Sequence, residues 1–226
     1  MAENFLDILT AGLQELGIEP DEEILNKYAL YHRELRNWSK AYNITGLKDD
    51  RAMAIRLFLD SLLYLKVFPD PSQVRARHPR VLDVGSGGGF PGVVLKIARP
   101  ELSISLMEPS WKKAGFLRHI CNKLRLTGIT VIQDTLQEYV KSAEGKVYDI
   151  IVTRALFRTY DFIRKTEKIL SRGGVLILSK GPAYCEEIKE AQTRLGNRIK
   201  DINMETIALK LPLTDIERYF IKVTLT

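Results

Sequence analysis

The chain has 226 residues, 45% of them hydrophobic and 27% charged, and no apolar run reaches the roughly 18 residues of a membrane span. Its acidic start, MAENFLDILT, is unlike a secretory signal, and Cys121 and Cys185 stand far apart, so we expect a cytoplasmic protein without a disulfide framework or a metal site. The net charge of +6 favours an anionic partner such as nucleic acid.

The first part of the chain predicts helices. Apolar residues recur at helical spacing over residues 5–16, and a second helix opens after Pro20 and ends in the segment WSKAYNITG, residues 38–46. A third helix begins near residue 49 and is too apolar to stand alone, so we expect it to pack against the C-terminal part of the chain. The segment 69–79 then holds three prolines and little apolar content, which indicates a linker.

We therefore predict two domains, a helical extension over residues 1–75 and a second domain over residues 76–226. From Arg80 onward the chain alternates short apolar runs with helical patterns, which is typical of a mostly parallel sheet. At its end, the runs 202–211 and 218–225 suit a hairpin that closes the sheet edge.

The most informative stretch is VLDVGSGGGFPG, residues 81–92. A short apolar strand breaks into four glycines, and a helical pattern begins after Pro91. Such a turn needs backbone angles that a Cβ forbids, and it lets a ligand come close to the main chain. The stretch predicts a nucleotide-type binding loop at the end of a first strand, although a glycine turn without a ligand is the plainer alternative.

The type of ligand depends on how this loop is aligned. Gly87, Gly89 and Gly92 match the dinucleotide fingerprint G-x-G-x-x-G. The strand, however, ends at Gly85, just after Asp83, and a carboxylate aimed into the loop repels a pyrophosphate. The same carboxylate suits a ligand that carries a sulfonium and an amino group. The pattern D-x-G-x-G-x-G therefore favours S-adenosylmethionine.

Later strand ends carry charged residues. The strand 102–107 ends at Glu108, about twenty residues beyond the loop, where such folds place a carboxylate on ribose hydroxyls. The strand 147–152 leads to Arg154, and the strand 175–178, which comes after a turn at two glycines, leads to Lys180. Because ligands of open α/β sheets bind at this rim, we favour a functional role for both cations over a surface role.

Several blocks now form a recognisable series: WSKAYNIT at 38–45, RLFLDS at 56–61, DVGSGGGFPG at 83–92, TRA at 153–155 and SKG at 179–181. With these blocks the chain resembles the RsmG family, also called GidB, bacterial methyltransferases that modify a guanine N7 in 16S ribosomal RNA. The resemblance implies an α/β fold, namely a Rossmann-like class I S-adenosylmethionine-dependent methyltransferase sheet with an N-terminal helical extension. It also implies 16S ribosomal RNA as the partner, expected within the small subunit, and we expect a monomer.

The resemblance and the loop together imply a set of cofactor contacts. They are Asp83, Gly85, Gly87, Gly89, Phe90, Glu108, Leu136, Gln137 and Arg154. Leu136 and Gln137 are expected beside the adenine, while Asp83 and Glu108 serve the methionine and ribose ends. The family often has a histidine at the position of Leu57, and an arginine and a glutamate at those of Thr135 and Gln137, so the chain departs from the pattern there.

The chemistry of guanine N7 agrees with the residues present. N7 already bears a lone pair and needs no general base, so catalysis is mostly alignment and electrostatic positioning. Arg154 and Lys180 are the candidate catalytic residues, and either would hold guanine O6 or a phosphate. For Trp38 and Tyr42, packing and RNA contact remain equally favoured. The other functions considered are a nicotinamide-dependent oxidoreductase and a non-catalytic RNA-binding protein of the ribosome.

Overall fold

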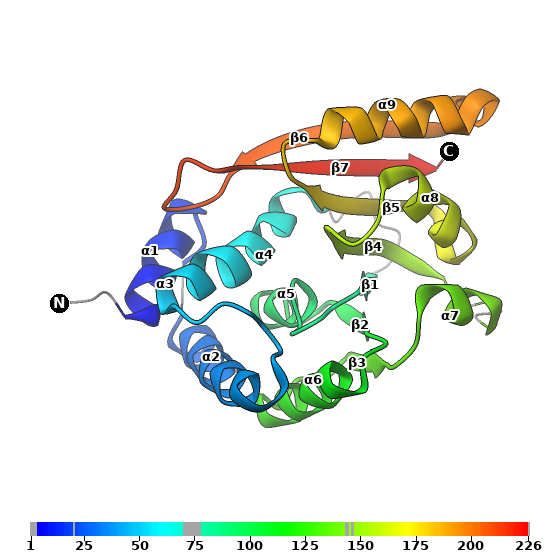
Figure 1. Ribbon diagram of the computed structural model, residues 1–226. Coiled ribbons are helices and arrows are strands. Elements are labelled where there is room, and N and C mark those ends of the chain that lie inside the picture. The colour runs from blue at the N-terminus through cyan, green and yellow to red at the C-terminus, as the bar shows by residue number, and fades with distance from the viewer. Residues whose placement is uncertain (1–3, 20, 70–77, 143–144, 146, 226) are drawn as a thin grey trace.

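The computed structural model describes residues 4–19, 21–69, 78–142, 145 and 147–225. Within these residues, seven strands form one sheet in the order β3-β2-β1-β4-β5-β7-β6 (Figure 1). The strands are β1 (Arg80–Val84), β2 (Ser103–Met107), β3 (Ile129–Ile132), β4 (Tyr148–Arg154), β5 (Leu170–Lys180), β6 (Ile202–Lys210) and β7 (Glu217–Leu225). Strands β1 to β5 run parallel, and β7 pairs antiparallel with both β5 and β6. The predicted mostly parallel sheet with a C-terminal hairpin is confirmed.

Helices precede and connect these strands. They are α1 (Phe5–Glu15), α2 (Glu22–Tyr42), α3 (Asp50–Met53), α4 (Asp60–Leu62), α5 (Gly92–Ala98), α6 (Trp111–Lys123), α7 (Leu136–Ser142), α8 (Thr159–Thr166) and α9 (Tyr184–Leu195). The side chains of Asn4, Asp21 and Asp49 cap α1, α2 and α3 by accepting hydrogen bonds from first-turn N–H groups. In the part of the chain that is described, none of the helices combines the length and apolarity needed to cross a bilayer.

The helices cover both faces of the sheet. Strand residues such as Val81 and Ile150 contribute to a core with α1, α2, α5, α6 and the segment from Met53 to Tyr64. Their neighbours Leu82 and Ile151 point to the opposite face, where α7, α8 and α9 pack. The third predicted helix therefore packs against the sheet domain, as expected. It has a π-helical stretch over Ala54–Leu59 and a 3₁₀ turn over Leu63–Lys66.

Buried tyrosines join the N-terminal helices to α5 and to the sheet. The hydroxyl of Tyr28 donates to the carbonyl of Val94 (3.0 Å), and that of Tyr64 donates to the carbonyl of Thr153 (2.8 Å). Burial raises the pKa of both phenols, so they stay protonated and remain donors. The predicted linker at 69–79 lies mostly outside the described residues, as does the predicted division at residues 75 and 76.

The start of β5 differs from the prediction. We expected a turn at Gly173-Gly174 and a strand from Val175 onward, but β5 begins at Leu170, which pairs with Tyr148. The register then shifts, and pairing resumes between Val175 and Ile150. Gly173 has a φ of 77° within this irregular stretch. The glycines therefore form a bulge inside a strand, a structure whose local sequence resembles that of a turn.

The hydrogen bond of Tyr64 predicts a measurable contribution to the free energy of unfolding. Tyr64→Phe leaves the ring packed and removes one buried hydrogen bond, so we expect the free energy of unfolding to fall by about 1 kcal/mol. Tyr42→Phe is the matched control, because the Tyr42 side chain is 43% exposed. Urea unfolding followed by circular dichroism measures both variants. Equal stability of Tyr64→Phe and the parent chain would contradict the role given to this hydroxyl.

Candidate active site

The glycine loop lies where the strand order reverses. Strand β1 sits between β2 and β4, and such a switch point opens a crevice at the carboxyl ends of the strands. Gly85, Gly87 and Gly89 have φ values of 77°, 58° and 98°, which side chains with a Cβ rarely adopt. A Cβ at Gly92 would overlap the Leu106 side chain, so the start of α5 also packs tightly on β2. These φ values agree with the prediction that the turn needs backbone angles that a Cβ disfavours.

Asp83 lies fully buried beside this loop. Its Oδ2 accepts a hydrogen bond from the N–H of Gly92 (2.9 Å), while among the described residues no donor reaches its buried Oδ1. Burial raises the pKa of the Asp83 carboxyl to about 6, against the opposing effect of the Gly92 hydrogen bond. A buried carboxylate oxygen without a donor is costly, and an ammonium group is the partner that would satisfy it. The site thus fits the amino group of S-adenosylmethionine.

Glu108 follows β2 on the other side of the loop and is also buried. Its Oε2 accepts from the N–H of Gly87 (2.9 Å), and its Oε1 accepts from the N–H of Ser110 (3.0 Å). Each carboxylate oxygen keeps a second lone pair, so these bonds leave room for ribose hydroxyls. The structure therefore brings Glu108 to the glycine loop, as its predicted role requires.

The residues predicted beside the adenine begin α7. Leu136 is buried and Gln137 is exposed. The N–H of Glu108 donates to the carbonyl of Ile132 (3.0 Å), so the end of β3, which leads to α7, lies next to Glu108. These positions are consistent with an adenine between Glu108 and α7, which stays a prediction.

Phe90 is buried, and its ring stacks on that of Tyr31 with 5.3 Å between centroids. Its side chain supports the loop from within the core, so a contact of Phe90 with a ligand would come from its main chain.

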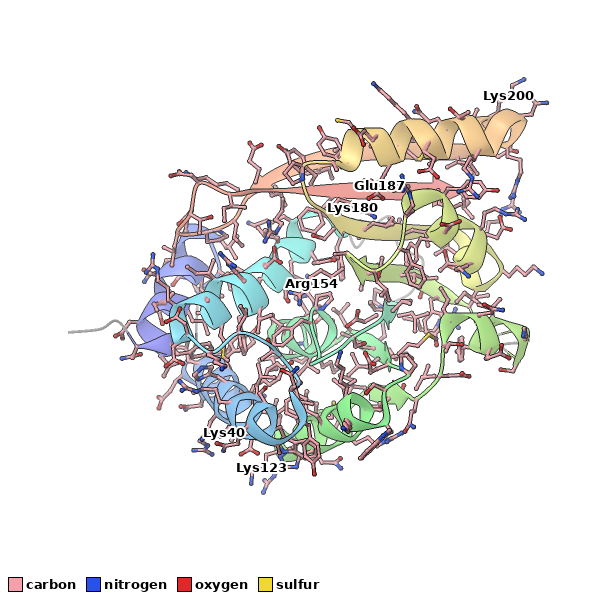
Figure 2. The ribbon with its side chains drawn as sticks, in the orientation of Figure 1. Lys40, Lys123, Arg154, Lys180, Glu187 and Lys200 are labelled. Atoms are coloured by element: carbon pink, nitrogen blue, oxygen red, sulfur yellow. The ribbon has the colours of Figure 1, made fainter. Side chains whose placement is uncertain are left out.

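Arg154 extends from the end of β4 toward the N-terminal helices (Figure 2). Its Nη1 donates to the carbonyl of Arg56 (3.1 Å) and lies 3.7 Å from Oδ2 of Asp60. Its Cζ is 5.7 Å from the centroid of the Phe90 ring. Arg154 is thus held beside the glycine loop, with part of its side chain still open to solvent.

Asp60 is a site residue that the sequence analysis did not single out. It is buried on α4, and its Oδ1 accepts from Nε of Arg218 on β7 (2.7 Å). Burial raises the pKa of Asp60, and the charges of Arg218 and Arg154 oppose this rise. The block RLFLDS contains Asp60, but the partners lie far away in sequence. The block alone therefore gave no sign of this ion-pair network.

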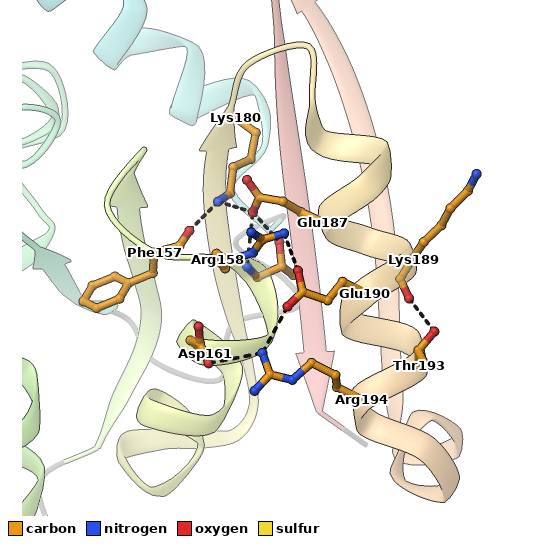
Figure 3. A network of polar contacts seen from close by, with 10 residues as sticks. Phe157, Arg158, Asp161, Lys180, Glu187, Lys189, Glu190, Thr193 and Arg194 are labelled. Carbon is orange, nitrogen blue, oxygen red and sulfur yellow. Dashed lines mark hydrogen bonds and ion pairs between the residues drawn. The ribbon is translucent and has the colours of Figure 1, made fainter.

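Lys180 is buried and held at its amino group (Figure 3). Its Nζ donates to Oε2 of Glu187 on α9 (2.5 Å) and to the carbonyl of Phe157 in the loop after β4. Lys180 nevertheless shares a cavity of about 320 Å³ with Arg154, together with Arg56, Asp60 and Arg218. The structure brings the two predicted catalytic cations to one cavity, with Lys180 in an ion pair.

Leu156 lies over the glycine loop and was not identified from the sequence. It comes after Ala155, whose φ is 54°, and its side chain is 55% exposed. A Cβ at Gly85 would overlap this side chain, so the two residues are in close contact. An isolated leucine after a strand carries no sequence signal of such a position.

Trp38 and Tyr42 differ in their surroundings. The ring of Trp38 lies 5.6 Å from that of Phe116 and 5.1 Å from that of His119, both on α6. Trp38 therefore packs against α6, while Tyr42 is 43% exposed and its ring lies 5.3 Å from that of Trp38.

Comparisons with known proteins agree with this arrangement. Residues 24–210 match the GidB family model, described as rRNA small subunit methyltransferase G. The chain is 29% identical over 217 residues to the ribosomal RNA small subunit methyltransferase G of Acinetobacter baylyi, covering 96% of this chain and 95% of that protein. It is 32% identical over 207 residues to the protein of the same name from Roseiflexus sp., covering 89% and 86%.

Solved structures show the same fold. The cofactor-bound protein Rv0187 from MTB aligns with a TM-score of 0.62 at 16% identity, covering 100% of this chain and 99% of that chain. An O-methyltransferase from Bacillus cereus in complex with SAH aligns with a TM-score of 0.60 at 13% identity, covering 95% of both chains. The fold is thus that of known methyltransferases, and the family match spans most of the chain. The chain belongs to the GidB family of rRNA small subunit methyltransferases G.

Proposed function

We propose that this protein transfers a methyl group from S-adenosylmethionine to N7 of a guanine in 16S ribosomal RNA. The observation that carries the proposal is the buried Asp83 carboxylate, whose Oδ1 meets no donor among the described residues, next to a glycine loop at the switch point of the sheet. The dinucleotide alternative fails on the same observation, because this carboxylate would repel a pyrophosphate. Membership of the GidB family supports both the reaction and the RNA substrate.

The chain offers a partner for each part of the cofactor. When bound, S-adenosylmethionine supplies a methyl group that its sulfonium activates for transfer. Asp83 accepts hydrogen bonds from the amino group, and the main chain of Gly85, Gly87 and Gly89 allows close approach. Glu108 accepts from the ribose hydroxyls, and the start of α7 flanks the adenine.

The target base is positioned by the cavity at the ends of β4 and β5. Because N7 carries its own lone pair, no residue has to remove a proton before transfer. Arg154 donates to O6 of the guanine or to a phosphate and leaves N7 free. Lys180 has its amino group on Glu187 and Phe157, so its role is to hold the loop that presents Leu156. The exposed Leu156 side chain gives the purine an apolar surface.

The setting of the reaction is part of the proposal. We place the substrate within the small ribosomal subunit and the reaction in the cytoplasm, with the protein acting as a monomer. We also propose that the chain divides near residue 75 into a helical extension and a cofactor-binding domain.

The direct test is a methyl-transfer assay. The purified protein is incubated with labelled S-adenosylmethionine and small subunits from cells that lack this protein, and the labelled nucleosides are then mapped. We expect the label in a single 7-methylguanosine of 16S ribosomal RNA. Proven cofactor binding without any labelled RNA would mean that the substrate is wrong and that the cofactor site stands.

Asp83 predicts a pH dependence of cofactor affinity. Below about pH 6 the carboxyl takes up a proton and loses its attraction for the ammonium, so affinity should fall as the pH drops from 7.5 to 5. Asp83→Asn should weaken binding at pH 7.5 by about 10- to 100-fold and remove this decline. Calorimetric titration measures both, with the exposed Glu186→Gln as control. A wild-type affinity that does not change with pH would contradict this role.

Asp83 also predicts how the stability of the cofactor-free protein depends on pH. Protonation of Asp83 should weaken cofactor binding but stabilise the free protein. The folded pKa of Asp83 lies above that of the unfolded chain, so its contribution to the free energy of unfolding falls as the pH rises from about 4 to 6. Asp83→Asn removes this cost and should stabilise the protein at pH 7.5 by about 2 kcal/mol relative to its effect at pH 4. Urea unfolding at both pH values measures the difference. An effect of Asp83→Asn on the free energy of unfolding that is the same at pH 4 and at pH 7.5 would refute it.

Arg154 has been assigned to the cofactor and to the target, and one variant separates the two roles. Arg154→Ala should lower kcat/KM for methyl transfer by about 100-fold, because the guanine loses its alignment. The affinity for S-adenosylmethionine should change little. Arg164→Ala, which removes an exposed arginine of α8, controls for the lost charge. Loss of cofactor affinity in Arg154→Ala, with kcat unchanged at saturating S-adenosylmethionine, would assign this residue to the cofactor and not to the target.

A further inference from the structure

The block WSKAYNITG, residues 38–46, packs on α6 through Trp38. Its turn comes after α2, and Asn43 takes the left-handed conformation with a φ of 49°. Ile44 is buried, and its Cγ2 lies 3.1 Å from the position that a Cβ on Gly88 would occupy. The turn therefore lies directly against the glycine loop, although the two segments are distant in sequence.

A cavity of about 300 Å³ opens on the outer side of this turn, between the end of α2 and the start of α3. Basic side chains line it, namely Arg36, Lys40 and Lys48, and Leu47 and Met53 add apolar surface. A cavity with cations around apolar walls suits a ligand that joins an anionic group to a flat or apolar one. A nucleotide unit of RNA has this combination.

The basic residues of the cavity differ in their freedom. Arg36 is paired with Asp50, which also contacts Nε2 of His32 (3.1 Å), so its guanidinium is held in place. Among the residues that the structure describes, no ion pair engages Lys40 or Lys48, and both are exposed. These two ammonium groups are therefore available to an external anion.

We propose that this cavity binds a nucleotide of the substrate RNA near the target guanine. Lys40 and Lys48 contact its phosphates, while Leu47 and Met53 contact its sugar or base. The inference rests on the proposed function and names a second place where the RNA is held. RNA is favoured over an acidic protein because the proposed reaction brings RNA to the glycine loop. The turn that lines the cavity with Asn43 and Thr45 packs its Ile44 against that loop.

The test compares two double variants that lose the same charge. Lys40→Gln/Lys48→Gln alters the cavity, and Lys189→Gln/Lys200→Gln alters exposed residues on α9 and just beyond it. Figure 2 shows Lys40 and Lys200 at opposite ends of the molecule, and Figure 3 shows the Lys189 side chain directed away from the Lys180 network. The measurements are KM and kcat with small subunits from cells lacking this protein, the affinity for S-adenosylmethionine, and the salt dependence of subunit binding.

For the cavity variant we expect KM for the subunits to rise about tenfold and the slope of log affinity against log salt to fall by about 1 to 2. The affinity for S-adenosylmethionine should stay at the parent value, which also shows that the variant is folded. The variant on α9 should behave like the parent protein.

Two results would overturn the inference. One is a cavity variant with the KM and the salt slope of the parent, and the other is an equal loss in both variants, which would indicate a general effect of net charge. If the parent protein transfers no methyl group, the proposed function fails instead. Filter binding of the same subunits to each variant then tests the cavity on its own, with unchanged affinity of the cavity variant as the contradicting result.

Discussion

The glycine loop depends on a hydrogen bond and on packing that come from the N-terminal helices. Its main chain is buried, and a buried carbonyl without a donor is costly. The hydroxyl of Tyr31 donates to the carbonyl of Gly88, and Ile44 packs against the same glycine. The N-terminal helices therefore complete the hydrogen bonding and the packing of the loop.

Two buried aspartates show how the same residue type serves different purposes. Asp60 pairs with Arg218 and lies near Arg154, so its charge is compensated and the network joins α4 to β7 and β4. Asp83 receives one hydrogen bond from Gly92, and its other oxygen meets no donor within the described residues. A buried carboxylate oxygen without a donor destabilises the protein when no ligand is bound, and a cationic ligand would supply the missing donor. This difference supports a structural role for Asp60 and the proposed ligand-binding role for Asp83.

The two cations at the strand ends, Arg154 and Lys180, differ in how many of their hydrogen-bond donors remain free for a substrate. Lys180 is a compact ammonium whose donors are used by Glu187 and the carbonyl of Phe157. Arg154 has a planar guanidinium with several donors, of which Nη1 contacts Arg56 and Asp60. A guanidinium can be fixed by one edge and still present another to a substrate. The geometry therefore favours Arg154 for contact with RNA and Lys180 for support of the neighbouring loop.

Much of the fold and of the cofactor site was determined by the sequence itself. Strand ends, glycine turns and helix caps depend on residues close in the chain, so local patterns predicted the loop and placed Asp83, Glu108 and Arg154 at strand ends. The local pattern gave a wrong prediction at Gly173, because glycines with a positive φ occur both in turns and in bulges within a strand. The tertiary structure alone decided which distant groups meet: Glu187 with Lys180, Arg218 with Asp60, and Ile44 with Gly88. These contacts depend on how helices stack on the sheet, because packing geometry joins residues that no local spacing relates.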